Sequence, residues 1–277
     1  MTVLTSEAVV LRTWPVHEAD LIVSFFTRDY GKLRGIAKSA LKSRKRFGGA
    51  LEPMTVARSF FAERPRQELV RLDQLEIVSS PLSRPVDAAR LATLSFYAEV
   101  LDEALPDHDP QETVFRLLLA VLDHTTIAQS ETIQPPSSGP QPSEPPPTGP
   151  PSTGPQSNGP WMALTYFSLW MTRLMGLLPD IGHCTACGSP LIAGQTSFNG
   201  LADGLFCALH RNGSVNSLSA DSWQLAQRML RAPAAAFATE PWPRRRAQDL
   251  RRFTLQSLER HLERKLRTAE ALTRLGG

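Results

Sequence analysis

The sequence predicts an α+β protein, in which a small five-stranded barrel is followed by a mainly helical domain with an embedded cysteine-bearing loop region. Three observations predict this arrangement. As far as residue 80 the apolar residues form short strand-like runs, and from about residue 84 they fall three and four apart, as on a helix face. A loop sequence with all three cysteines then separates two helical segments. With 277 residues, of which 42% are hydrophobic, the chain is long enough to bury such cores.

Five strand-like runs account for the barrel. Turn signals separate them, among them RDYG at 28–31 and RPRQ at 64–67. Five short antiparallel strands are enough to close a small barrel. The runs are EAVVLRT (7–13), ADLIVSFFT (19–27), KLRGIAK (32–38), TVARSFFAE (55–63) and ELVRLDQLEIV (68–78).

The remaining apolar segments have helical spacing. Segment 161–178 is apolar enough to resemble a membrane span, but Arg173 and several hydroxyl groups interrupt it. A central arginine costs roughly 2.5 to 3.5 kcal/mol in a bilayer, so we expect a buried core helix and no membrane contact. The other segments are 89–105, 113–124 and 219–232, and a long closing helix with an apolar stripe of Leu250, Phe253, Leu258, Leu262, Leu266 and Ala269.

A proline-rich segment divides the helical part. Residues 134–160 hold 11 of the 23 prolines and one charge, so they can neither form a helix nor bury apolar side chains. We expect a disordered insertion rather than a ligand for a proline-binding partner, because nothing basic flanks its PxxP spacings. The predicted organisation is a barrel domain at 1–80, a helical domain in two parts at 81–133 and 161–277, and a cysteine loop region at 183–213.

Charge is distributed unevenly along the chain. The net charge of +3 conceals opposed regions: residues 1–80 sum to +4, residues 81–130 to −5 and residues 161–277 to +6. The densest basic run is KSALKSRKRFGG at 38–49, which contains no acid. The basic residues of this run are Lys38, Lys42, Arg44, Lys45 and Arg46. The preceding hairpin extends it with Arg28, Lys32 and Arg34.

Mobile cations beside a small barrel are typical of OB-folds that bind the nucleic-acid backbone. Counterion release favours each neutralised phosphate whatever the base, so we expect binding with little sequence preference and a steep loss with salt. The alternative is a solvated loop whose charge aids solubility. Phe47, Phe60 and Phe61 are expected in the barrel core rather than stacked on bases.

The cysteines have the spacing of a metal site. Cys184 and Cys187 form a C-x2-C pair, and Cys207 and His210 form a C-x2-H pair after a spacer of 19 residues. Paired zinc knuckles have similar spacing, and each knuckle directs two ligands to one tetrahedral ion. Three thiolates and one imidazole fill four positions and leave none for a water nucleophile. The sequence therefore predicts one structural Zn2+.

Neighbouring residues bear on this prediction. Gly188 and Gly204 suit the tight backbone of the two turns, and His183 is an alternative fourth ligand. Three unrelated buried thiols are the alternative to any metal. Because three cysteines cannot all pair and no signal-like segment opens the chain, we expect a reducing cytoplasm.

Two stretches of the chain match the pattern of a known family. Residues 7–54 contain a strand, an E-x-D, a TRxxGK turn, a basic loop and FGGxLEP. Residues 174–191, LMGLLPDIGHCTACGSPL, are followed by GLFCALH at 204–210. In this order, the stretches resemble the bacterial RecO family of recombination and DNA-repair mediators.

The resemblance implies an N-terminal OB-fold, a helical domain with a zinc knuckle, and no catalytic turnover. It implies binding of single- and double-stranded DNA, annealing of complementary strands, contact with the tail of the single-strand-binding protein, and partnership with RecR in loading RecA recombinase, at the nucleoid in the bacterial cytoplasm. The resemblance implies that Cys184, Cys187, Cys207 and His210 bind zinc. Many members of the family have a fourth cysteine at the position of His210. DNA contact falls on Arg34, Lys38, Lys42, Arg44, Lys45 and Arg46.

The closing segment suggests a second basic surface. Between Arg244 and Arg274 stand ten Arg or Lys against four acids, opening with Arg244, Arg245 and Arg246. Two basic surfaces that hold two strands at once would lower the repulsion between phosphate backbones, which gives a hypothesis for annealing. A helix face solvated by arginine is the alternative.

Two other functions are compatible with the sequence. The first is a zinc-stapled protein adaptor whose basic charge is incidental. The second is a metal-dependent enzyme acting on nucleic acid, which needs an open coordination site or paired carboxylates. His17, Glu18 and Asp20 lie close together, but no second cluster accompanies them, so we do not expect catalysis there.

Overall fold

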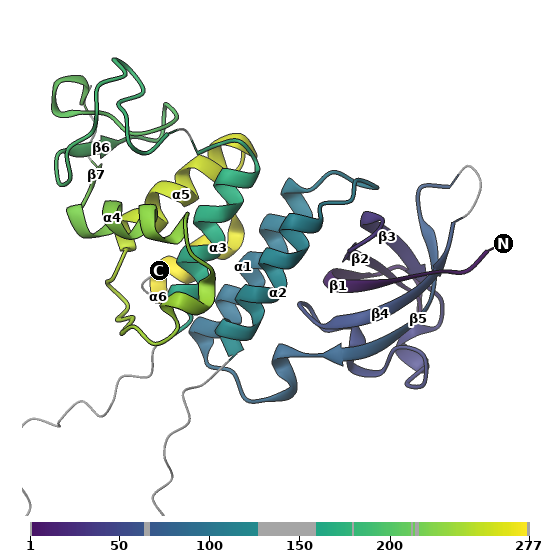
Figure 1. The fold of residues 1–277 in the computed structure, drawn as a ribbon. Helices are drawn as coiled ribbons and strands as arrows, with labels where there is room; N and C mark the ends of the chain where they lie inside the picture. Colours follow the sequence, from purple (N-terminus) through teal and green to yellow (C-terminus); the bar gives the residue numbers. More distant parts are fainter. Residues whose placement is uncertain are drawn as a thin grey trace, which may run out of the picture.

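The computed structural model describes residues 2–63, 67–126, 159–178, 180–211, 213 and 216–275. Except for its last two residues, the predicted insertion at 134–160 lies outside these ranges, as does most of the turn at 64–67. The described chain forms a barrel at one end, a group of helices beside it, and the cysteine region beyond the helices (Figure 1).

Five strands close the barrel: β1 (Leu4–Pro15), β2 (Leu21–Thr27), β3 (Gly31–Ala37), β4 (Val56–Ala62) and β5 (Val70–Ser79), in the order β1-β2-β3-β5-β4. The predicted barrel is confirmed, but the expectation of antiparallel pairing throughout is wrong for β3 and β5, which pair in parallel. After β3 the chain crosses the end of the barrel and pairs β4 with β1. The β4–β5 hairpin therefore brings β5 to β3 in the same direction.

Alternate residues of the strands fill the barrel. Phe25 and Phe61 meet edge to face with ring centroids 5.9 Å apart. Phe47 and Phe61 are fully buried, as predicted, whereas Phe60 is half-buried. This difference follows from the period of two along β4, which sends Phe60 outward and Phe61 inward.

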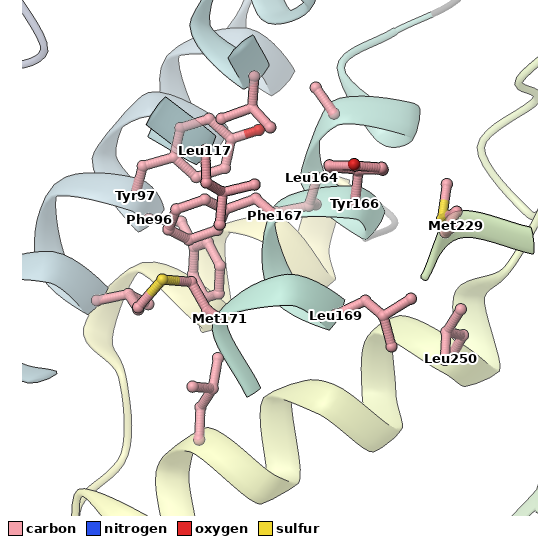
Figure 2. Close-up of a cluster of buried hydrophobic side chains, with 14 of the residues drawn as sticks. Phe96, Tyr97, Leu117, Leu164, Tyr166, Phe167, Leu169, Met171, Met229 and Leu250 are labelled. Carbon is pink, nitrogen blue, oxygen red and sulfur yellow. The ribbon is translucent and has the colours of Figure 1, made fainter. Parts of the chain in front are cut away.

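The helical part is built around α3 (Trp161–Leu174). Every residue from 161 to 169 is buried, which confirms a core helix. Phe167 lies between Phe96 and Tyr97 of α1 (Ala88–Ala104), with ring centroids 6.3 Å and 4.3 Å away (Figure 2). The neighbouring helix α2 (Glu112–Thr126) packs on α3. Among the described helices, none has the length and hydropathy to cross a membrane.

The predicted long closing helix is two helices, α5 (Gln248–His261) and α6 (Arg267–Leu275). The break lies at Glu263, whose φ is 53°, and the N–H of Arg264 donates to the carbonyl of Glu259 at 3.1 Å to end the first helix. No glycine or proline marks this end in the sequence, so the apolar periodicity alone predicted one continuous helix. The break returns α6 to α1, where Glu99 accepts hydrogen bonds from the backbone N–H groups of Arg267 and Thr268.

The barrel and the helices share one interface. Val9, Leu11 and Phe26 of the barrel belong to the same buried cluster as the helical core, and Phe26 meets Phe115 of α2 edge to face at 5.4 Å. At Gly31, φ is +72° and an added Cβ would lie 2.3 Å from the backbone oxygen of Asp109. Only glycine permits this close approach of the β2–β3 hairpin to the helical part.

Candidate nucleic-acid interface and metal centre

The basic loop, residues 38–47, is attached to the turn between β1 and β2. Ser39 has a left-handed backbone with φ 52°, and its N–H donates to Oδ1 of Asp20 at 2.7 Å. The N–H of Leu41 donates to the carbonyl of Ala19 at 3.2 Å. Asp20 therefore has a structural role that accounts for its place in the acidic cluster beside His17 and Glu18.

Arg46 holds the loop together from within. Its guanidinium donates to the carbonyl of Lys38 at 2.7 Å and to Oγ of Ser43 at 3.0 Å, and it stacks over the ring of Phe47 at 5.1 Å. The carbonyl of Arg46 accepts from the N–H of Leu75 on β5 at 2.9 Å. Of the predicted DNA contacts, Arg46 is thus the one already engaged by its own loop.

The other predicted cations point to solvent. All five are exposed, and none has a carboxylate partner among the described residues. No acid stands between Asp29 and Glu52 in the sequence, so the basic loop carries no acid of its own, and Asp20 of the β1–β2 turn contacts its backbone. These exposed cations are Arg34, Lys38, Lys42, Arg44 and Lys45.

The hairpin cations Arg28 and Lys32, which were expected to extend this surface, instead face the helical part. Lys32 is 4% exposed, and its Nζ donates to the carbonyl of Asp102 at 2.5 Å and lies 3.2 Å from Oδ1 of Asp107. Arg28 binds Glu7 at 2.6 Å. Asp107, beside Lys32, and Glu112, 3.8 Å from Arg28, belong to the acidic segment, whereas Glu7 lies on β1. Part of the charge difference between the two parts of the chain is therefore neutralised where they meet.

An outer ledge on the barrel lies between the basic loop and the helices, and the sequence reasoning missed it. Strand register places Trp14 beside Ile22 and Ile22 beside Ile36, on one outer row of β1, β2 and β3, and all three are half-buried. The next row places Arg12 and Arg34 on either side of Ser24. The alternation of side chains along β1 could have predicted this ledge, because Trp14 falls on the outward side once the bulge after Val10 is counted.

The cysteine cluster (Cys184, Cys187, Cys207 and His210) converges as predicted. One ligand atom from each lies within 4.8 Å of the others. The sulfurs of Cys187 and Cys207 are 4.0 Å apart, and Sγ of Cys207 is 3.3 Å from Nδ1 of His210. Ligands at the Zn–S distance in a tetrahedron are about 3.8 Å apart, so this donor set fits one ion.

Two tight turns and a small sheet position the cluster. Gly188 and Gly204 have φ of +69° and +88°, as expected for the knuckle backbone. Strands β6 (Thr196–Phe198) and β7 (Asn216–Leu218) pair below the turns. Burial opposes ionisation of the Cys184 thiol, but the N–H groups of Cys207, Cys187 and Ala186 lower its pKa to about 6. A readily formed thiolate suits a metal ligand.

His183, the alternative ligand, does not join the cluster. Its Nδ1 pairs with Oδ2 of Asp180. The adjacent residue Cys184 is buried and turns toward the opposite knuckle. The structure thus selects His210 as the fourth candidate donor.

The closing basic segment divides into exposed and internal arginines. Arg244 and Arg245 are exposed, but Arg246 pairs with Glu240 and stacks over the Trp242 ring at 4.3 Å. Arg251 is buried and donates to the carbonyls of Arg244 and Arg246 at 2.7 Å each. Burial lowers the pKa of Arg251 to about 10.

Comparison with known proteins decides the family. Residues 1–81 match the model for the Recombination protein O N terminal, and residues 155–270 match the model for the Recombination protein O C terminal. The chain is 46% identical over 270 residues to the DNA repair protein RecO of Koribacter versatilis (strain Ellin345), covering 98% of both chains. The chain belongs to the RecO family.

More distant RecO proteins agree with this assignment. DNA repair protein RecO of Anaeromyxobacter sp. (strain K) is 31% identical over 270 residues, which cover 97% of this chain and 95% of that protein. That of Thermoanaerobacter sp. (strain X514) is 26% identical over 188 residues. The barrel, the helical part and the cysteine cluster described above therefore belong to a DNA repair protein of the RecO family.

Proposed function

We propose that this RecO-family chain is a non-enzymatic recombination mediator, which binds single- and double-stranded DNA and anneals complementary strands. We further propose that it works with RecR and the single-strand-binding protein to load RecA recombinase, at the nucleoid in the cytoplasm. The family assignment supports the partners. The observation that carries the DNA-binding part is the set of exposed cations at Arg34, Lys38, Lys42, Arg44 and Lys45 beside the outer ledge.

The geometry supports a backbone-directed mode of binding. The exposed lysines and arginines would neutralise phosphates, which gives affinity without sequence preference. Trp14, Ile22 and Ile36 form a half-buried apolar row on which bases of a single strand could stack, with the Arg12 guanidinium over the Trp14 ring at 5.1 Å. Arg46 is then a positioning residue that keeps the loop in place.

A salt series tests the DNA-binding proposal. Lys42, Arg44 and Lys45 are replaced by Gln, and fluorescence anisotropy of a labelled single strand is measured from low to high salt. Each lost phosphate contact lowers the slope of log K against log salt by about 0.7, so we expect a fall of up to about 2 and weaker binding at low salt.

The matched control for this test removes the same charge elsewhere. Arg116, Arg252 and Arg274 are exposed on α2, α5 and α6, and their replacement by Gln should leave the slope nearly unchanged. Equal losses in both variants would mean that net charge alone governs binding. Absence of DNA binding by the unaltered protein would favour a zinc-stapled adaptor.

We also propose that the cysteine cluster holds one structural Zn2+. Four protein donors complete a tetrahedral sphere, which supports a role in stability and leaves no open position for hydrolysis. When bound, the ion would crosslink the two knuckle turns. Beside it, strands β6 and β7 pair as a small sheet.

Metal analysis of two variants tests this assignment. Cys184→Ser should lose the stoichiometric zinc of the purified protein and lower its melting temperature, because three donors bind zinc weakly. His183→Ala, at the adjacent residue, should keep both. Zinc retained at normal stability in Cys184→Ser would refute the site, and zinc lost in His183→Ala would place that imidazole among the ligands.

A further inference from the structure

Helix α4 (Ala220–Met229) and the residues just after it present an outward stripe of hydrogen-bond donors. Positions three and four apart on a helix share a face. From Gln224 onward the residues on this face carry carboxamide or guanidinium groups, and Asp221 stands at its N-terminal end. The stripe consists of Gln224, Gln227, Arg228 and Arg231. The opposite face is buried against the core through Ser222, Leu225, Ala226 and Met229.

Three hollows join end to end along this stripe. The first, of about 590 Å³ beside the cysteine region, shares Gln227 and Arg231 with the second, of about 520 Å³. The second shares Gln224 and Arg228 with the third, of about 690 Å³, which reaches Arg245. Neighbouring hollows therefore meet at shared side chains, and we refer to the three together as the groove. We name its donors the α4 track: Arg173, Gln224, Gln227, Arg228, Arg231 and Arg245.

The cations of the α4 track are available for an anion. In the part of the chain that the structure describes, Arg173, Arg231 and Arg245 have no carboxylate partner. Arg228 pairs with Glu240 and lies over the Phe237 ring at 5.2 Å. A guanidinium held flat on a ring is fixed in orientation and keeps further N–H groups for an incoming oxyanion.

The acids nearby leave an excess of positive charge. Asp180 lines the first hollow, where it accepts from the N–H of Gly182 at 2.8 Å and pairs with His183. Asp221 lines the third hollow in the first turn of α4, and Glu240 beside it is bound by two arginines. The middle of the groove, between these ends, is lined by no acid.

We propose that the α4 track binds the phosphate backbone of a second single strand of DNA while the barrel holds the first. This inference rests on the proposed function and assigns its annealing step to a surface. Arginine and glutamine are common donors to phosphate. Donors at helical spacing repeat about every 5 to 6 Å, which suits the consecutive phosphates of an extended strand.

A strand fits this groove better than a protein partner does. The hollows also contain apolar side chains, among them Leu191 and Trp223 in the first and Phe237 in the second. What favours a strand is the row of guanidinium groups along them, whose charge a phosphate backbone would neutralise. In addition, α4 lies on the side of the helical part away from the barrel (Figure 1). A strand on the α4 track would therefore leave the barrel surface accessible to the first strand.

The experiment measures capture of a second strand. Protein is loaded on an immobilised oligothymidine, and retention of a second labelled oligothymidine, which cannot pair with the first, is recorded together with the annealing rate of a complementary pair. Replacement of Arg173, Arg231 and Arg245 by Glu should lower second-strand capture and annealing by about tenfold or more. Affinity for the first strand should change by less than about twofold because the barrel is unaltered.

Controls separate the possible outcomes. Arg58, Arg84 and Arg116 are exposed outside the closing basic segment, and their replacement by Glu gives the same net charge and should keep second-strand capture. Equal loss in both variants overturns the proposal, as does normal capture by the track variant. A third outcome also overturns the proposal. If the track variant no longer binds a poly-glutamate peptide but still captures the second strand, the surface serves an acidic protein partner instead.

A milder variant guards against misfolding. Arg231→Gln changes one exposed side chain and should lower second-strand capture about threefold with an unaltered melting temperature; unchanged capture would contradict the proposal. Failure of the unaltered protein to bind even the first strand would instead refute the proposed function, so the two failures are distinguishable.

Discussion

Two groups of cations on the barrel have opposite surroundings although they are neighbours in sequence. Lys32 is 4% exposed and bonded to the helical part, whereas Arg34, two residues along the same strand, is exposed without a carboxylate partner among the described residues. Arg28 is likewise paired, and Lys38 is free. Basic residues in one run therefore divide between holding the protein together and meeting a ligand.

The difference teaches that charge density alone does not locate a binding surface. The helices cover the part of the barrel near the β2–β3 turn, so cations there are desolvated and must be paired. The basic loop lies beyond the covered area, where lysine and arginine keep their hydration and can exchange it for phosphate. The following changes test this division, from the largest expected effect to the smallest.

Lys32→Met should have the largest effect on stability. It leaves the carbonyl of Asp102 and the carboxylate of Asp107 without their cation, which should lower the free energy of unfolding by roughly 2 to 4 kcal/mol in urea titration. The slope of DNA binding against salt should stay unchanged. Arg34→Met is the matched control and should show the reverse, a smaller slope at normal stability. A changed slope in Lys32→Met would mean that the division is wrong.

Arg28→Gln should have an intermediate effect. The variant loses the pair with Glu7 and the stacking of the guanidinium over Phe115 at 4.9 Å, which together contribute about 1 kcal/mol. Because salt screens the partly exposed pair, the deficit in urea titration should shrink at about 1 M salt. Arg58→Gln, at the exposed position of β4, should cost nothing measurable. A deficit independent of salt would show that packing on Phe115 dominates.

Arg46→Lys should have the smallest effect and separates positioning from contact. Lysine keeps the charge but cannot make both hydrogen bonds to Lys38 and Ser43, so the loop is held less firmly. We expect DNA affinity to fall about threefold with an unchanged salt slope. If affinity is fully retained, Arg46 acts as a simple phosphate contact, and anisotropy titration at two salt concentrations distinguishes these outcomes.

Local patterns predicted much of the fold, and long-range geometry limited the rest. The five strands and the core helix at 161–178 follow from alternation and helical spacing, which reflect burial on one face. The parallel pairing of β3 with β5 depends on how the chain crosses the barrel, and no local signal carries it. The break at Glu263, after α5, depends on the contact of α6 with α1, which overrides an apolar stripe that continues in the sequence.

The candidate sites show the same contrast. The cysteine cluster could be predicted, because two-residue spacing forces each pair of ligands to one side of a turn. The fate of Lys32 could not, since its partner Asp102 is 70 residues away. Likewise, the α4 track combines Arg173 with residues of a later helix and becomes visible only when both line one groove.

The return of α6 to α1 has a consequence for synthesis on the ribosome. The barrel closes with strands from the first 79 residues, whereas Glu99 must wait for Thr268, 169 residues later. Domains generally fold in the order in which they emerge, so we expect the barrel to form early and the helical core to complete last. Until α2 has emerged, the apolar patch of Val9, Leu11 and Phe26 is without its helical cover, because Phe115 of α2 packs on Phe26. Pulse proteolysis of stalled nascent chains should therefore find a protected barrel before any protected helical part. The helical core becomes complete only when α6, the last helix described, packs on α1.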